Sequence, residues 1–179
     1  EAAFYGPKID FLAKDSLGRE WQVATIQLDM NLPERFDLVC MNEKSEKERI
    51  VMIHCAIMGS IERYLAILIE HFAGIFPLWL SPVQAEVIPV LAEQNEYAKK
   101  ISEALKNAWV RTELRDDDEG FGKKIRGAKV EKVPYFLVIG EKEMTEGKVT
   151  LESRDKGNLG VMTLEEVLVK LQREIAEKK

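Results

Sequence analysis

The chain has 179 residues, of which 46% are hydrophobic and 32% are charged. This composition is typical of a globular protein and excludes disordered, collagen-like and low-complexity chains. Acidic residues outnumber basic ones by 31 to 26. A nucleic-acid binder that depends on a basic excess to displace counterions is therefore excluded as well, whereas an RNA-binding protein with a local basic face remains open.

Two cysteines, Cys40 and Cys55, are too few for a disulfide framework and are typical of a reducing cytoplasm. The longest apolar stretch, residues 66–80, is interrupted by Glu70, His71 and Pro77, so no segment has the length of a membrane span. The chain does not begin with methionine, and we expect no signal peptide in it. We expect a cytoplasmic protein of which this chain is one piece.

Residues 1–80 have the pattern of a sheet followed by a helix. The residues of strand 20–30 are apolar on both faces, which is typical of a strand covered on both sides. Gln22 and Gln27 on this strand are either structural amides with internal partners or side chains that face a ligand. The full set of strands predicted in this part is 9–14, 20–30, 36–41 and 49–53.

Helical periodicity begins after Ser60, a residue suited to an N-cap, and predicts a helix over 61–72. Its apolar residues surround the axis, which is typical of an interior helix. Arg63 lies in its first turn among apolar neighbours and needs an anion. That anion is either an internal carboxylate or a phosphate of a ligand.

An apolar connector with two prolines, residues 75–82, predicts a domain boundary that separates residues 1–80 from residues 81–179. The second part alternates strands and helices, so we expect an α/β domain with a mixed, mainly parallel sheet. The predicted elements are strands 85–90, 110–114, 134–139 and 148–153, helices 95–108 and 121–132, and a last helix with a capping box from Thr163 to Glu166.

Few residues suggest chemistry by their pattern alone. His54 ends a strand, where a histidine is either a core residue or a ligand, and a single histidine does not make a zinc site. The basic face of helix 121–132 is either solvated or in contact with RNA phosphates. The chain has no phosphate-binding glycine loop, nucleophile elbow or Cys-x-x-Cys motif.

Several short segments nevertheless carry a resemblance when they are read in order. They are Ala3-Phe4-Tyr5-Gly6-Pro7-Lys8-Ile9-Asp10, Thr25-Ile26-Gln27-Leu28-Asp29, Leu32-Pro33-Glu34-Arg35-Phe36, Val51-Met52-Ile53-His54, Gly59-Ser60-Ile61-Glu62-Arg63 and Phe76-Pro77-Leu78-Trp79-Leu80-Ser81-Pro82-Val83-Gln84. Together they resemble the C-terminal part of the threonyl-tRNA synthetases, a class II family. The resemblance runs over nearly the whole chain. It implies the end of an antiparallel catalytic domain, with its interior helix, followed by an α/β anticodon-binding domain.

The resemblance also implies roles in a catalytic site. Arg63 matches the arginine of the third class II signature, which lies on the phosphates of ATP, a substrate that arrives with Mg²⁺. Lys8 would lie near the α-phosphate, and Gln22 would contact ATP. Tyr5 and Gln27 would contact threonine.

His54 matches the single zinc ligand that this part of the family contributes. In the family the zinc ion holds the amino group and the hydroxyl of threonine. The first two class II signatures, the other two zinc ligands and the editing region have no counterpart in the chain. The homodimer interface of the intact family is likewise mostly absent.

In the second domain, Arg115, Lys124, Arg126 and Glu143 match family positions near the anticodon, which implies tRNA(Thr) as the partner. We therefore expect part of a threonine–tRNA ligase, which activates threonine with ATP and transfers it to tRNA, and we expect this chain alone to be inactive. A non-catalytic tRNA-binding or regulatory module derived from a synthetase is the alternative, and a structural interaction domain is a third possibility.

Overall fold

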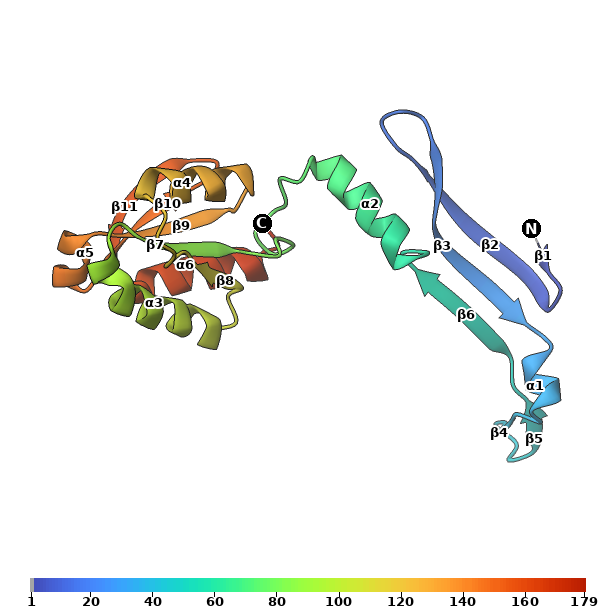
Figure 1. The fold of residues 1–179 in the computed structure, drawn as a ribbon. Coiled ribbons are helices and arrows are strands. Elements are labelled where there is room, and N and C mark those ends of the chain that lie inside the picture. The colour runs from blue at the N-terminus through green and yellow to red at the C-terminus, as the bar shows by residue number, and fades with distance from the viewer. Residues whose placement is uncertain (1) are drawn as a thin grey trace. The chain divides into compact units, whose positions relative to one another are not determined.

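The structure, a computed structural model, describes residues 2–179 and divides between Phe72 and Ala73 into two compact units (Figure 1). The connector at 75–82, which motivated a boundary after residue 80, belongs to the second unit. No helix in the described part of the chain has the length and apolar character that a membrane span requires.

The first unit is built around an antiparallel sheet with the strand order β1-β2-β3-β6, and β4 and β5 form a separate hairpin. Its elements in chain order are β1 (Ala2–Ala3), β2 (Gly6–Lys14), β3 (Glu20–Asp29), α1 (Leu32–Arg35), β4 (Val39–Met41), β5 (Lys47–Arg49), β6 (Met52–Ile57) and α2 (Ile61–Phe72).

The loop between β2 and β3 is where the turn residues predicted it. The Asp15 carboxylate accepts hydrogen bonds from the backbone N–H groups of Leu17 and Arg19, both at 2.9 Å, which closes the turn. The predicted strand 49–53 is wrong in its bounds, because it joins the last residue of β5 to the start of β6. The predicted strand 36–41 is shorter, because its first three residues follow the short helix α1, which the sequence analysis missed.

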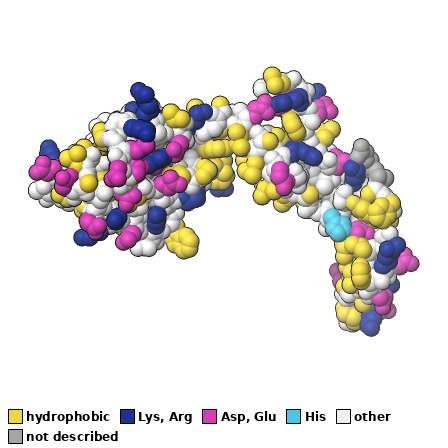
Figure 2. Space-filling model, viewed as in Figure 1, with side chains coloured by type: hydrophobic (Ala, Val, Ile, Leu, Met, Phe, Trp, Pro, Cys, Tyr) yellow, Lys and Arg dark blue, Asp and Glu magenta, His cyan; other side chains and the backbone are white. Residues whose placement is uncertain are grey.

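Helix α2 begins where it was predicted, and the Ser60 hydroxyl accepts a hydrogen bond from the Arg63 N–H at 3.2 Å. The prediction of an interior helix is wrong within this chain, because none of its residues is buried. Ile61, Leu65 and Ile69 are exposed. Figure 2 shows hydrophobic side chains at the surface of the first unit. Periodicity reports which face a helix is able to bury, whereas burial also requires a second layer, which the sheet of this unit does not provide over α2.

The second unit has a five-stranded sheet with the order β11-β10-β9-β7-β8. Its elements are β7 (Ala85–Pro89), η1 (Ala92–Gln94), α3 (Asn95–Asn107), β8 (Thr112–Leu114), α4 (Phe121–Val130), β9 (Tyr135–Ile139), α5 (Glu141–Glu146), β10 (Val149–Ser153), β11 (Gly157–Met162) and α6 (Leu164–Ala176).

The sheet is mixed, as predicted, but it is not mainly parallel. Strand β7 pairs in parallel with β8 and β9, whereas β10 pairs antiparallel with both β9 and β11. The difference arises from β11, which the sequence analysis missed because its two glycines, Gly157 and Gly160, weaken the strand pattern.

Alternating residues of the central strands supply two apolar layers. Val87 and Leu137 face the layer that contains α3 and α6, and Ile88 and Phe136 face the layer that contains Ala128 of α4 (Figure 1). The last helix carries the predicted capping box, in which Thr163 Oγ1 accepts from the Glu166 N–H at 3.3 Å and Glu166 accepts from the Thr163 N–H at 2.8 Å.

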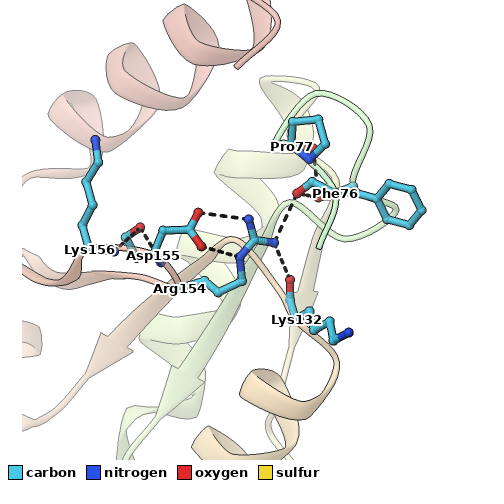
Figure 3. Close-up of polar contacts among 8 residues, drawn as sticks. Phe76, Pro77, Lys132, Arg154, Asp155 and Lys156 are labelled. Atoms are coloured by element: carbon cyan, nitrogen blue, oxygen red, sulfur yellow. Dashed lines mark hydrogen bonds and ion pairs between the residues drawn. The ribbon is translucent and has the colours of Figure 1, made fainter. Parts of the chain in front are cut away.

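The connector is fixed to the second unit by side chains that bind its backbone. Arg154 donates to the carbonyl oxygens of Phe76 at 3.2 Å and Lys132 at 2.9 Å, and its guanidinium also pairs with Asp155 at 2.8 Å (Figure 3). Because three groups hold one planar fork, this arginine fixes the connector against the body of the unit.

Candidate functional site

Three of the predicted site residues lie in one row across the first sheet. Lys8 of β2 pairs directly with Gln27 of β3, and Gln27 pairs directly with His54 of β6. Directly opposite residues of an antiparallel pair have their side chains on the same face. The register therefore brings together residues that are 19 and 27 positions apart.

A cavity of about 370 Å³ lies beside the His54 end of this row. Its polar lining comes from the end of β3, from α1, from β6, and from Tyr5 and Asn31, which lie just outside these elements. The residues that line it are Phe4, Tyr5, Gln27, Asp29, Asn31, Leu32, Arg35 and His54. Three of the predicted site residues, Tyr5, Gln27 and His54, are thus neighbours in space.

Tyr5 is held against Gln27 at the edge of this cavity. Its hydroxyl donates to Gln27 Oε1 at 3.1 Å, and its backbone carbonyl accepts from the Met30 N–H at 2.9 Å. The carbonyl oxygen of Gln27 is thereby used, while its amide group has no hydrogen bond within residues 2–179. The side-chain oxygen of Gln27 is therefore paired, while its amide nitrogen still has two N–H donors for a ligand. This agrees with the interpretation that Gln27 faces a ligand.

His54 pairs with a carboxylate that the sequence analysis missed. Its Nε2 lies 2.9 Å from Asp29 Oδ2, and Asp29 is only 4% exposed. The pKa of the Asp29 carboxyl is lowered, mainly because the Leu32 N–H donates to it. Burial opposes this effect, and the His54 ring and the Asn31 N–H add to it. The carboxylate is therefore a fixed negative charge in the lining of the cavity.

A second carboxylate organises the Lys8 end of the row. Asp10 pairs with Lys8 at 2.8 Å, and its Oδ1 accepts from Gln22 Nε2 and from Thr25 Oγ1, both at 2.7 Å. The Gln22 side chain thus has an internal partner, as expected for a structural amide. Lys8 remains 19% exposed, so a ligand on this face of the sheet has access to its ammonium group.

Arg63 reaches from the first turn of α2 to the strand that carries Gln22. Its Nη1 donates to the Gln22 backbone carbonyl at 3.2 Å, and within residues 2–179 no carboxylate pairs with it. The internal-carboxylate interpretation of Arg63 is therefore wrong for the described chain. The close approach requires glycine at position 59, because a Cβ there would lie 2.7 Å from the same carbonyl oxygen.

The residues present fit one of the ligand positions of a zinc site. Histidine nitrogen is a zinc ligand, and His54 Nδ1 has no hydrogen bond in the described part of the chain. Both oxygens of Asp29 are already engaged. The cluster of three acidic side chains with metal-ligand spacing in residues 2–179, formed by Glu86, Glu113 and Glu131, lies in the second unit and is bridged by an arginine.

That arginine is Arg115, one of the four residues predicted near the anticodon. Its Nη2 donates to Glu86 at 2.9 Å and also to Glu131. Glu86 is fully buried, which raises the pKa of its carboxyl even though the guanidinium opposes the effect. The two carboxylates raise the pKa of Arg115. Arg115 thus compensates a buried charge as well as lying at the end of a parallel strand.

The other three predicted residues differ in how available they are. Lys124 is buried and donates to the Arg115 backbone carbonyl at 2.7 Å. Glu143 accepts from the Gly140 N–H at 3.1 Å and from the Thr150 hydroxyl at 2.8 Å, so it caps α5. These bonds lower the pKa of its carboxyl against the opposing effect of burial. Arg126 alone of the four is exposed and makes no hydrogen bond within residues 2–179.

Asp29 and Glu86 were not predicted as site residues. A carboxylate two residues before Asn31 is a turn signal, which predicts backbone capping but not a histidine 25 positions away. Glu86 interrupts an otherwise apolar strand, and a charged residue there signals a buried partner without identifying it.

Two family models match the chain, one over each of its two units. Residues 1–72 match the model "tRNA synthetase class II core domain (G, H, P, S and T)", and residues 84–174 match the model "Anticodon binding domain". The chain is 51% identical over 178 residues to a threonine–tRNA ligase of Caldanaerobacter subterraneus, and 53% identical over 179 residues to one of Thermus thermophilus. It covers 28% and 27% of these two relatives, which cover 99% and 100% of it.

A solved structure shows the same fold. It is the RNA binding domain of threonyl-tRNA synthetase from Cryptosporidium parvum Iowa II, 39% identical, with a TM-score of 0.85 over 97% of this chain and 44% of that one. The chain therefore belongs to the threonyl-tRNA synthetase family, of which it represents the end of the class II core and the anticodon-binding domain.

Proposed function

We propose that this chain is the part of a threonine–tRNA ligase that completes the catalytic site and binds tRNA(Thr), with residues 1–80 serving catalysis and residues 81–179 the anticodon. The observation that supports this most is the row of Lys8, Gln27 and His54 beside the cavity. These polar side chains lie on one face of the sheet. The relatives of the chain are threonine–tRNA ligases, whose substrates such groups would bind.

The ATP side of the site uses Lys8, Gln22 and Arg63. The Arg63 guanidinium, which lacks a carboxylate partner in the described chain, would bind the phosphates of MgATP through its planar fork. Lys8 would stabilise the charge that develops at the α-phosphate when the threonine carboxylate attacks. Gln22 would contact ATP, while its bond to Asp10 keeps its amide in place.

The amino-acid side uses Tyr5, Gln27 and His54. Tyr5 and Gln27 would contact threonine, and the free amide donors of Gln27 suit its oxygen atoms. A zinc ion bound by His54 and by ligands from elsewhere in the ligase would supply a Lewis acid for the amino and hydroxyl groups of threonine. A site that binds a hydroxyl rejects valine, which lacks it.

A chimera tests this proposal. The chain replaces the matching C-terminal 27% of the Thermus thermophilus relative, and threonine-dependent ATP–pyrophosphate exchange is measured. We expect exchange, and we expect K8A or R63A in the chimera to lower its rate by about 100- to 1000-fold. The matched control is K14A on the same strand, whose side chain is exposed, and it should leave the rate unchanged. Exchange that survives both K8A and R63A would contradict the assignment.

The 179-residue chain alone should not catalyse exchange. It supplies one zinc ligand and one side of the ATP site, and catalysis requires both substrates to be held in a reactive geometry. In the intact ligase we infer a homodimer in the cytoplasm, a setting that suits the free thiols of Cys40 and Cys55. Threonine-dependent exchange by the chain above the level of an R63A control would refute this expectation.

The proposed anticodon interface makes a separate prediction about Arg126. R126A should weaken binding of a tRNA(Thr) transcript and lower the slope of the binding constant against salt by about one ion, because its exposed guanidinium has no internal partner in the described chain. K100A, on α3 at the opposite face of the sheet, is the matched control and should change neither quantity. Filter binding at several salt concentrations measures both. Equal effects of R126A and K100A would exclude a specific role for Arg126.

A non-catalytic tRNA-binding module is the second candidate. The observation that favours it is a contrast between the two units. The second unit has a buried apolar core, whereas helix α2 of the first unit has no buried residue. Under this alternative the chain binds tRNA but the chimera gives no exchange, so the two experiments above separate the candidates.

A further inference from the structure

The carboxylate of Asp29 lines the cavity and contacts His54, but the proposed function gives it no part so far. It lies at the end of β3, two residues beyond Gln27, which is the direct partner of His54 in the sheet. The diagonal position places its Oδ2 at 2.9 Å from His54 Nε2.

The backbone fixes this carboxylate from the other side. Asp29 Oδ1 accepts from the N–H groups of Asn31 at 2.8 Å and Leu32 at 2.9 Å. The residue is only 4% exposed, so water does not compete for these bonds. Asp29 is therefore held in a single orientation with one oxygen left for the imidazole of His54.

This contact determines which nitrogen of His54 carries the proton. An ionised carboxylate only accepts hydrogen bonds, so Nε2 must be the donor in the neutral ring. The lone pair then belongs to Nδ1, which makes no hydrogen bond in the described chain. The His54 side chain is 43% exposed and lines the cavity, so a ligand has access to it.

We infer that Asp29 is a positioning residue for His54, which fixes its Nε2–H tautomer and thereby makes Nδ1 the atom that a zinc ion binds. A carboxylate behind a metal-binding histidine orients the ring and raises its basicity. The inference rests on the proposed function, because that proposal supplies the zinc. It adds the choice of nitrogen, and it joins the metal site to the backbone of α1.

The test uses the whole 179-residue chain with nitrogen-labelled histidine. Long-range proton–nitrogen NMR spectra, recorded on the neutral rings at alkaline pH, identify the protonated nitrogen. We expect Nε2–H at His54. In D29N the side-chain oxygen still accepts from the N–H groups of Asn31 and Leu32, and the side-chain nitrogen donates to His54 Nε2. Nε2 then becomes an acceptor, so the proton of the neutral ring should move to Nδ1. His71, on α2, is the internal control and should not change.

A second measurement follows the binding of zinc to His54. Added zinc should shift the Nδ1 resonance of His54, and D29N should weaken this binding by about 10- to 100-fold. A native chain with the Nδ1–H form, a mixed population like that of a free imidazole, or a D29N spectrum equal to the native one would overturn the inference. If D29N fails to fold, the spectrum of the native chain decides alone.

The outcomes separate this inference from the proposed function. The Nε2–H tautomer together with an inactive chimera would leave the role of Asp29 standing and remove the ligase assignment. An active chimera with the opposite tautomer would remove only the role of Asp29.

Discussion

Replacing Gly6 with alanine is expected to destabilise the first unit by at least about 2 kcal/mol. A Cβ at this position would lie 2.1 Å from the Leu28 carbonyl oxygen of the neighbouring strand, at a φ of +154°. The obstacle is backbone, so no side-chain rotation relieves it. The edge of the sheet must move, and Tyr5 moves with it, away from Gln27.

Urea unfolding followed by the fluorescence of Trp21 measures this effect in a background that lacks the other two tryptophans, Trp79 and Trp109. Gly18 provides the matched control, because it also has a positive φ, +78°, but a Cβ there would meet nothing within 4 Å. G18A should cost only about 1 kcal/mol, the strain of the backbone alone. Equal losses for the two variants would show that the clash at position 6 has no energetic weight.

R115A is expected to destabilise the second unit by about 3–5 kcal/mol at neutral pH, because it leaves the buried charge of Glu86 uncompensated. Burial already raises the pKa of this carboxyl above 4.5, and loss of the arginine raises it further. A group with a raised folded-state pKa costs stability as the pH rises through and above its unfolded value. The deficit of R115A should therefore be smallest near pH 4.5 and grow toward neutral pH.

Thermal unfolding over this pH range measures the deficit. The double variant E86Q/R115A removes the charge together with its partner and should recover most of the loss at neutral pH. R173A is the control for an ordinary surface ion pair, since Arg173 pairs with Glu177 while 74% of its side chain is exposed, and it should cost less than about 1 kcal/mol. A pH-independent deficit in R115A would exclude charge burial as its cause.

The elements that the sequence predicted well are those whose signals are local. The capping residues Ser60 and Thr163 were assigned correctly, because an N-cap depends on three or four consecutive residues. The elements that were not predicted are β1, α1, η1, α5 and β11. Four or six residues are too few to display a helical period, and glycines obscure the alternation of β11.

The site was harder to predict, because its geometry depends on register. The row of Lys8, Gln27 and His54 follows from pairings across three strands, and the register of β2 on β3 shifts between Phe11 and Leu12. Alternation assigns each residue to a face but does not align one strand with the next. The resemblance supplied these residues, whereas Asp29 required coordinates.

The attachment of the connector has a consequence for how its sequence is able to vary. Three side chains hold this segment by its main chain, namely Arg154, Arg111 and Gln84. They donate to the backbone carbonyl groups of Phe76, Leu78, Trp79 and Ser81. Every amino acid, proline included, has such a carbonyl. Substitution at the more exposed positions of the segment, such as Trp79, is therefore tolerated wherever the path of the chain is kept. The constraint falls instead on Leu78 and Ser81, which are buried, and on the three side chains that hold the backbone.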